Sequence, residues 1–132
     1  MVAFENKYGK FEYIRDKKLV IVSCFPSTGH MTDEEYKQLA TKLAEVYEEY
    51  KPQIVLVRHQ DFNFLITPEI QEWINKNVIS KLKEAGTKKV AFIVPQDIFA
   101  QVSVEQTVSD RNLPFEKRFF EDEDSAMKWL LE

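Results

Sequence analysis

The stretch Gln53–Arg58, with the sequence Gln-Ile-Val-Leu-Val-Arg, decides the fold of this chain. Its consecutive apolar residues lack the polar alternation of a half-exposed strand, so they predict a short strand that is buried on both faces. Pro52 precedes this strand and a polar segment follows it. Such strands are typical of the centre of parallel sheets, whose crossover connections are usually helices. We therefore expect the helical patterns on either side to cover a parallel sheet.

Two further strand-like segments come before this central strand. Phe11–Ile14 alternates in polarity, whereas Leu19–Phe25 begins with a uniformly apolar run. The polar turn Arg15–Lys18 joins them, which predicts a hairpin with Phe11–Ile14 at the edge of the sheet. The short aromatic segment Phe4–Gly9 ends at a glycine, and its pattern assigns it to no element.

A first helix is predicted by its capping residues and its apolar stripe. Thr32 is followed three residues later by Glu35, which is the spacing of a capping box. Apolar residues then recur at steps of three and four, as expected for one face of a helix. They are Tyr36, Leu39, Ala40, Leu43, Val46, Tyr47 and Tyr50. Lys51 and Pro52 end this helix directly before the central strand.

A second helix is predicted to follow the central strand. Thr67 is its expected N-cap, and Pro68 takes the first helical position, where a missing N–H costs nothing. Gly86 suits its C-terminal end. The apolar stripe between these ends consists of Ile70, Trp73, Ile74, Val78 and Leu82.

The rest of the chain continues this alternation of strands and helices. Val90–Val94 predicts a second buried parallel strand, and Asp97–Ser109 predicts a helix despite several β-branched residues. Phe115–Phe120 predicts a short last strand, and Asp122 is placed to cap a final helix. The expected order is β-β-α-β-α-β-α-β-α. The fold class is therefore α/β, with a mostly parallel five-stranded sheet and an antiparallel N-terminal edge strand.

Length and composition narrow the classes of function. A chain of 132 residues is expected to form one domain over residues 1–132. Its net charge of −4 is a poor match for nucleic acid or for anionic lipid headgroups. The single cysteine fits a reducing compartment, and no apolar run suggests a signal peptide or a membrane insertion. These features predict a cytoplasmic protein.

Several segments together resemble a known group, the SpoIIAA-like (STAS-type) domains, and in particular its small stand-alone bacterial members. The segments that carry the resemblance are Met31–Lys37, Thr67–Trp73, Ala85–Phe92, Asp97–Gln101, and Phe120 with Ala126, Trp129 and Leu130. The resemblance implies sequential β-α units with an antiparallel first strand at the edge. It also suggests kinship with the CRAL-TRIO lipid-exchange domains, which share that superfamily.

The classical members of that group are anti-sigma-factor antagonists, which are switched by phosphorylation of a serine at the start of the helix after the third strand. The corresponding segment here is Arg58–Pro68, which lacks the Asp-Ser-Ser-Gly arrangement. Thr67 is its only hydroxyl, and we interpret this residue as an N-cap. No phospho-acceptor is therefore predicted.

Ligands of open α/β sheets bind beyond the carboxyl ends of the strands. The most polar of these ends contains Arg58, His59 and Asp61, and it precedes the helix that carries Trp73. These four residues are our candidates for ligand binding. The alternative interpretation is that the polar ones are solvated loop residues. The aromatic residues of this half either line an apolar pocket or fill the core, and we favour the core for Phe62, Phe64, Trp73, Phe92 and Phe99.

No motif for catalysis, metal or cofactor binding is present. The glycines form no phosphate-binding loop, and no serine lies in a nucleophile elbow. Cys24, His30 and His59 lack the spacing of metal ligands, and Cys24 is expected to be a small buried residue. We predict no catalytic residue, no metal and no cofactor.

Three hypotheses for function follow. The first is a non-enzymatic binding or regulatory module that acts through a protein partner or a homodimer, with Phe11–Ile14 as a free edge for docking. The alternative is a carrier of a small apolar ligand or lipid, which rests on the CRAL-TRIO kinship and on the high phenylalanine content. An enzyme that uses Arg58 and His59 is the third.

Overall fold

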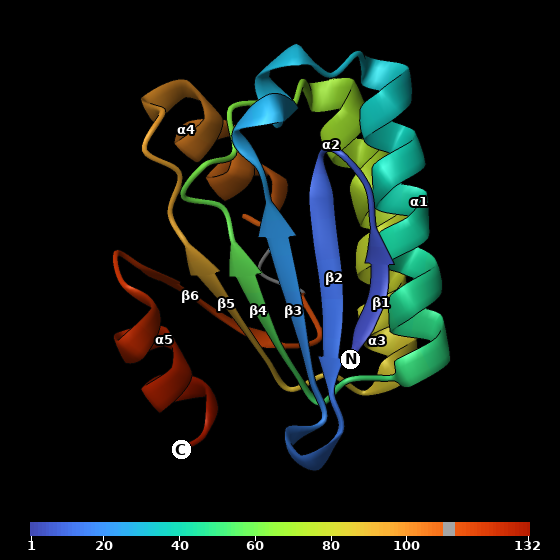
Figure 1. The fold of residues 1–132 in the computed structure, drawn as a ribbon, viewed down its shortest axis with the longest axis vertical. Coiled ribbons are helices and arrows are strands. Elements are labelled where there is room, and N and C mark those ends of the chain that lie inside the picture. Colours follow the sequence, from blue (N-terminus) through green and yellow to red (C-terminus); the bar gives the residue numbers. More distant parts are fainter. Residues whose placement is uncertain (110–112) are drawn as a thin grey trace.

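A computed structural model of the chain describes residues 1–109 and 113–132. A single mixed sheet of six strands crosses it in the order β1-β2-β3-β4-β5-β6 (Figure 1). The strands are β1 (Val2–Glu5), β2 (Gly9–Ile14), β3 (Leu19–Cys24), β4 (Ile54–Arg58), β5 (Lys89–Ile93) and β6 (Glu116–Phe120). Strands β1 to β3 pair antiparallel, and β3 to β6 pair parallel. The predicted α/β class is confirmed.

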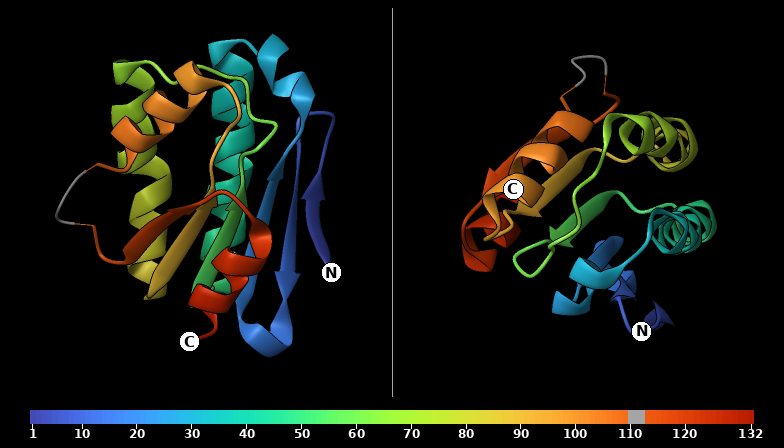
Figure 2. Two further views of the ribbon diagram at one scale, coloured as in Figure 1. Left: turned by 90° about the vertical axis from the view of Figure 1, so that its left-hand side faces the viewer. Right: turned by 90° about the horizontal axis from the view of Figure 1, so that it is seen from above.

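Helices cover the two faces of the sheet unequally. The α-helices are α1 (Asp33–Tyr50), α2 (Pro68–Ile74), α3 (Ser80–Ala85), α4 (Ile98–Thr107) and α5 (Glu123–Leu130). Short helical turns are η1 (Arg15–Lys17), η2 (Pro26–His30) and the π-helical turn η3 (Asn75–Ile79), which links α2 to α3. Side chains from α1, α2, α3 and α4 share one core cluster, and those from α5 form a second cluster on the opposite face. Figure 2 shows the sheet between these layers.

Strand β4 confirms the prediction of a central strand buried on both faces. It pairs with β3 on one side and with β5 on the other, parallel to both. Val55 and Val57 belong to the larger cluster, whereas Ile54 and Leu56 belong to the cluster under α5. Because side chains alternate along a strand, each face of β4 contributes to a different core.

The structure adds a strand that the sequence pattern did not indicate. Residues Val2–Glu5 form β1, so the sheet has six strands, and Phe11–Ile14 lies inside the sheet between β1 and β3. Strand β1 is short and none of its side chains is fully buried, so its sequence shows no periodicity. The turn is set by Asn6, whose Oδ1 accepts hydrogen bonds from the backbone N–H groups of Tyr8 and Gly9.

The residues at the helix ends follow the expected rules with one exception. The capping box of Thr32 and Glu35 is complete, and Gly86 ends α3 with a φ of 75°. Asp122 caps α5, as predicted, by accepting from the N–H of Ser125. Thr67 occupies the N-cap position of α2, as predicted, although its side chain makes no capping hydrogen bond.

The two-sided burial of β4 gives a direct test of the fold. We expect Leu56→Ala, at a side chain with 0% exposure, to lower the free energy of unfolding by about 2–5 kcal/mol, because it leaves a cavity. Leu65→Ala is the matched control, since that side chain is 55% exposed and its loss is expected to stay within about 0.5 kcal/mol. Urea unfolding of both variants measures the difference. Equal losses would contradict the central position of β4.

Candidate functional site

Arg58 and His59 are neighbours in sequence, but the sheet separates their side chains. Arg58 continues the alternation of Ile54 and Leu56, so its side chain lies on the α5 face. His59 follows β4 and lies on the opposite face, where its ring packs among residues of the larger core cluster. No single site therefore joins the two groups, and this arrangement opposes the hypothesis of an enzyme that uses both.

Arg58 is held by charged and polar groups on the α5 face. Its Nε and Nη2 donate to the two carboxylate oxygens of Glu123 at 2.7 and 2.9 Å, and Nη1 donates to Ser23 Oγ at 3.3 Å. Glu12 lies 4.0 Å from the same guanidinium. The bond to Glu123 raises the pKa of Arg58 above its ordinary value, more than partial burial lowers it. Arg58 thus fixes the start of α5 to the central strand.

The imidazole of His59 is stacked in aromatic surroundings. Its ring centroid lies 4.5 Å from that of Phe62, with an angle of 20° between the planes, and 6.1 Å from that of Phe92. The side chain is partly exposed, but its Nδ1 atom is buried and has no hydrogen-bond partner among residues 1–109 and 113–132. Burial lowers the pKa of His59 to about 3, so the ring is uncharged at neutral pH.

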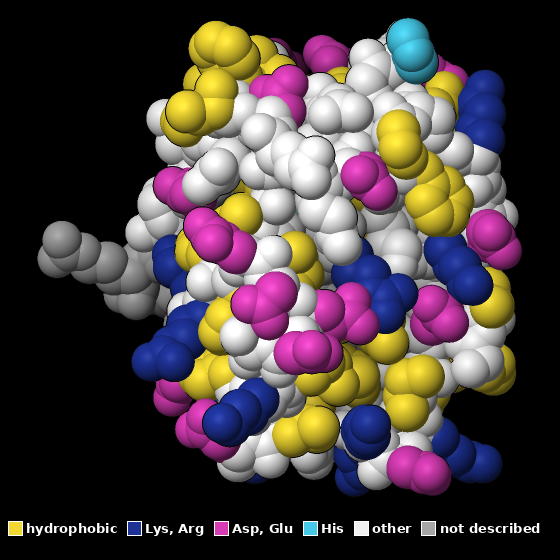
Figure 3. Space-filling view, turned by 60° about the vertical axis from the view of Figure 1, so that its left-hand side comes forward, with side chains coloured by type: hydrophobic (Ala, Val, Ile, Leu, Met, Phe, Trp, Pro, Cys, Tyr) yellow, Lys and Arg dark blue, Asp and Glu magenta, His cyan; other side chains and the backbone are white. Residues whose placement is uncertain are grey.

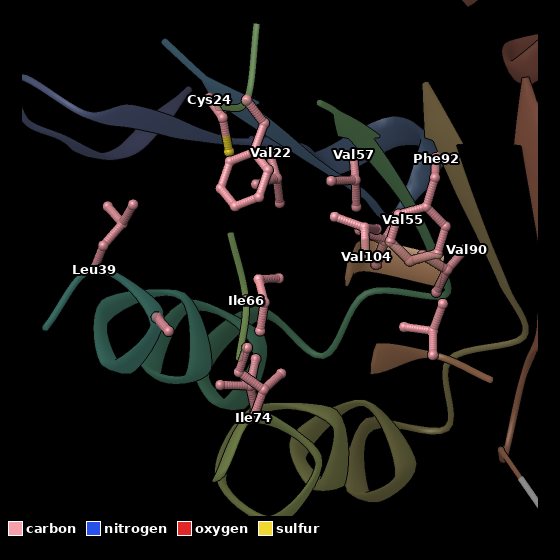
Figure 4. Packing of buried hydrophobic residues seen from close by; sticks show 14 of the residues in the cluster. Val22, Cys24, Leu39, Val55, Val57, Ile66, Ile74, Val90, Phe92 and Val104 are labelled. Carbon is pink, nitrogen blue, oxygen red and sulfur yellow. The ribbon is translucent and has the colours of Figure 1, made fainter. Parts of the chain in front are cut away.

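His59 belongs to the wall of an apolar cavity of about 100 Å³ within the larger core cluster. Figure 4 shows how Val22, Val57 and Phe92 of the sheet face Leu39 of α1 and Ile74 of α2 across this core. The further lining residues are Phe11, Cys24, Tyr36, Ala40, Leu43, Tyr47, Phe62, Ile66, Val78, Ile79, Leu82, Val90, Val104, Thr107, Val108 and Phe115. No Lys, Arg, Asp or Glu is among the described residues that form this wall. The cavity is therefore chemically suited to an uncharged apolar molecule.

Cys24 shares this cavity with His59, but its environment favours the thiol. Burial raises the pKa of Cys24 to about 12, so the thiolate is disfavoured at neutral pH. Burial also raises the pKa values of Tyr36 and Tyr47. Within the part of the chain that the structure describes, no group of three or more His, Cys, Asp or Glu residues is arranged to hold a metal ion.

The other two candidate residues lie away from the cavity wall. Asp61 is exposed in the loop after β4. Trp73 of α2 is partly buried, and the Nζ of Lys37 lies 5.8 Å from the centroid of its ring. The structure thus distributes Arg58, His59, Asp61 and Trp73 over separate surroundings, and that of His59 is the wall of the cavity.

The sequence interpretation missed an exposed apolar surface on α4. Phe99 was expected in the core, but 73% of it is exposed, and Ile98 and Val102 are 67% and 47% exposed. The inner side of the same helix buries Ala100 and Val104. The sequence of α4 is apolar on both sides of the helix, and one of those sides must face outward in a surface helix. This pattern could have indicated a binding surface.

The family model named SpoIIAA-like matches residues 22–131. The chain belongs to the SpoIIAA-like family. A search of the curated proteins and a search of the solved structures each found no match. Membership of the SpoIIAA-like family supports a regulatory or binding module. Among the described residues, no helix is both long and apolar enough to cross a lipid bilayer.

The lowered pKa of His59 makes the stability of this SpoIIAA-like protein dependent on pH. The folded-state pKa of about 3 lies below the ordinary value of 6.5, so the unfolded chain binds more protons between these two values. The free energy of unfolding is therefore expected to fall as the pH drops below 6.5, by up to about 1.4 kcal/mol per pH unit. Urea unfolding of the wild type and of His59→Phe from pH 7 to pH 4 measures this dependence.

In that comparison, His59→Phe is expected to lose less stability in acid than the wild type. His30→Phe is the control, because His30 is exposed, and it should behave like the wild type. Carboxylates with lowered pKa values, such as Glu35 and Asp122, also make the free energy of unfolding fall in acid. This contribution is the same in all three proteins, so it cancels in the comparison. An unchanged pH dependence in His59→Phe would contradict a buried neutral imidazole.

Proposed function

We propose that this protein is a non-enzymatic regulatory module that binds another protein through an apolar surface on α4. The observation that carries the proposal is a cluster of exposed hydrophobic side chains, which we call the α4 patch. It consists of Leu65, Ile98, Phe99 and Val102, which are 55%, 67%, 73% and 47% exposed. Apolar side chains gathered on a surface mark sites of interaction. The reducing compartment that the single cysteine favours is, in this proposal, the cytoplasm.

The segment before α2, which carries Leu65 of the α4 patch, is fastened to α4. The backbone N–H of Ile66 donates to Ser103 Oγ at 3.1 Å, which brings the neighbouring Leu65 close to the helix. On α4 itself, Ile98 and Val102 are four positions apart in the sequence and so lie on the same side. Figure 3 shows hydrophobic side chains at the upper left, the corner that α4 occupies.

The charges around the α4 patch favour a basic partner. Residues 59–75 and 94–109 contribute to this corner and contain no Lys or Arg, whereas Lys37 of α1 lies beside it, with its Nζ 5.8 Å from the ring centroid of Trp73. The two segments do contain Asp61, Asp97 and Glu105, all of which are exposed. A partner with an apolar centre and a basic rim is complementary to such a surface, whereas a second copy of the chain or an anionic membrane would place like charges opposite each other.

The complementarity of the α4 patch can be measured with two helical peptides. Both have one leucine face, and one carries a lysine rim while the other carries a glutamate rim. We expect the lysine-rimmed peptide to bind, and Phe99→Ser and Val102→Ser to weaken this binding about tenfold because they remove apolar contact area. Isothermal titration calorimetry at low and high salt measures these affinities.

Val2→Ser is the matched control for Val102→Ser, because Val2 is 49% exposed on the distant strand β1. It should leave binding unchanged. Equal binding of the two peptides, or equal loss in Val2→Ser, would contradict the proposal. Sedimentation equilibrium provides a further check, since a wild-type dimer that Val102→Ser abolishes would show that a second copy occupies the patch.

The apolar cavity favours a second candidate function, the binding of a small apolar ligand. Its volume of about 100 Å³ is smaller than the volumes of about 300–1,000 Å³ typical of drug-sized ligands. It approaches the apolar cavity of about 150 Å³ that binds benzene in another protein. The ligand of this second candidate is therefore a single small molecule, and a full-length lipid chain does not fit the volume.

Benzene is a suitable probe for the cavity. We expect it to raise the midpoint of thermal unfolding, Tm, by a few degrees, since a ligand that binds only the folded state stabilises it. Ala40→Leu should abolish the shift, because Ala40 lines the cavity and the larger side chain fills it. Ala44→Leu is the control, as Ala44 has the same 7% exposure but is not part of the lining. Differential scanning calorimetry measures the benzene-dependent shift of each variant, and equal shifts in the two would contradict binding in this cavity.

A further inference from the structure

An open cleft lies on the outside of the molecule, between the turn that joins β1 to β2 and the first three turns of α1. Figure 1 shows β1 alongside this helix. We call it the α1 cleft, and its wall includes Phe4, Lys7, Tyr8, Glu35, Leu39 and Lys42. Its volume of about 600 Å³ falls in the range of about 300–1,000 Å³ that is typical of sites for small molecules.

The α1 cleft offers a fixed apolar surface to a ligand. Leu39 is 5% exposed and belongs to the larger core cluster. Phe4 packs against the same cluster, with its ring centroid 5.6 Å from that of Phe11. Because packing holds both side chains, the apolar part of the wall is in place before a ligand binds.

The charged residues of the wall are two lysines and one glutamate, and the glutamate is already satisfied. The Oε1 of Glu35 accepts from the N–H of Thr32 at 3.0 Å, and its Oε2 accepts from the hydroxyl of Tyr8 at 2.7 Å. The bond from Tyr8 is the main cause that lowers the pKa of Glu35, and the charge of Lys7 is the smallest. Neutral donors thus stabilise this carboxylate and leave the charge of Lys7 largely uncompensated.

Lys7 is the cation that an anionic ligand would meet first. Lys7 is exposed, and its Nζ lies 5.0 Å from the centroid of the Tyr8 ring in the wall. Within residues 1–109 and 113–132, no carboxylate forms a salt bridge with it. Lys42 lies 3.5 Å from Glu45, but both side chains are more than half exposed, and such pairs are weak in water. Lys42 is therefore a second available cation.

We propose that the α1 cleft binds a small organic acid with an apolar body. The carboxylate pairs with the ammonium group of Lys7, and the body contacts Leu39 and Phe4. A cation beside an apolar surface is complementary to such a molecule, whereas Lys7 repels an amine. The site is separate from the α4 patch. Leu39 also lines the internal cavity, so the test has to distinguish the cleft from that cavity.

Three probes that share one apolar body test the charge of the ligand. Phenylpropionate is an anion, phenylpropanol is neutral and phenylpropylamine is a cation. We expect phenylpropionate to bind most tightly and the amine least, as measured by calorimetry. Lys7→Gln should weaken phenylpropionate about fivefold and leave phenylpropanol unchanged, because it removes only the charge. Lys17→Gln is the matched control, since Lys17 is exposed in η1 at the opposite end of β2.

Ala40→Leu separates the two places of binding, because Ala40 lines the internal cavity but not the α1 cleft. Phenylpropionate should still bind to this variant, and loss of binding would assign the probe to the cavity and overturn the proposal. Equal affinities of the three probes, or equal losses in Lys7→Gln and Lys17→Gln, would overturn it as well.

Amide NMR of the wild type provides a readout that needs no variant. Phenylpropionate is expected to shift the backbone amide signals of Lys7 and Lys42, which lie on the two sides of the α1 cleft. The signal of Lys17 should stay in place. Unmoved signals of Lys7 and Lys42 at the highest concentration of phenylpropionate would overturn the proposal, even where a variant fails to fold.

Discussion

The burial of β4 on both faces is the constraint on which the rest of the structure depends. Val55 and Leu56 are adjacent in sequence and both have 0% exposure, so apolar layers must cover both sides of the sheet. The larger layer is built from α1, α2, α3 and α4, and the smaller from α5. The same alternation directs Arg58 to one layer and His59 to the other at the carboxyl end of the strand. The fold thus determines which chemistry is possible on each side before any ligand is considered.

Much of this fold was predictable because its signals are local. The capping box at Thr32, the glycine at Gly86 and the apolar run of β4 each reflect an interaction within a few residues. Strand β1 is different, because its place in the sheet depends on pairing with β2 after the Asn6 turn. The π-helical turn η3 was also not predicted. There the amide of Asn75 donates both to Gln71 and, across to α4, to the carbonyl of Thr107, which is a tertiary contact.

The candidate site was less predictable than the fold. The sequence selected His59 as a polar residue after a strand, but its burial depends on the ring of Phe62, which the loop folds back onto it. Successive side chains of β4 point to opposite faces of the sheet. Had this alternation been extended past the last apolar residue of the strand, it would have predicted Arg58 and His59 on opposite faces. Phe99 was assigned to the core because α4 is apolar on both sides, and periodicity cannot orient such a helix. Its orientation comes from small inner residues such as Ala100 and Ser103, which allow close packing.

The α4 patch and the internal cavity of this SpoIIAA-like protein meet at one helix. Val104 and Thr107 on the inner side of α4 line the cavity, and Val102 on the outer side belongs to the α4 patch. The sheet walls of the cavity are joined by continuous backbone ladders, whereas α4 is tied to its neighbours by side-chain hydrogen bonds such as those of Ser103 and Asn75. A molecule bound in the cavity would therefore contact the inner side of the helix whose outer side carries the α4 patch.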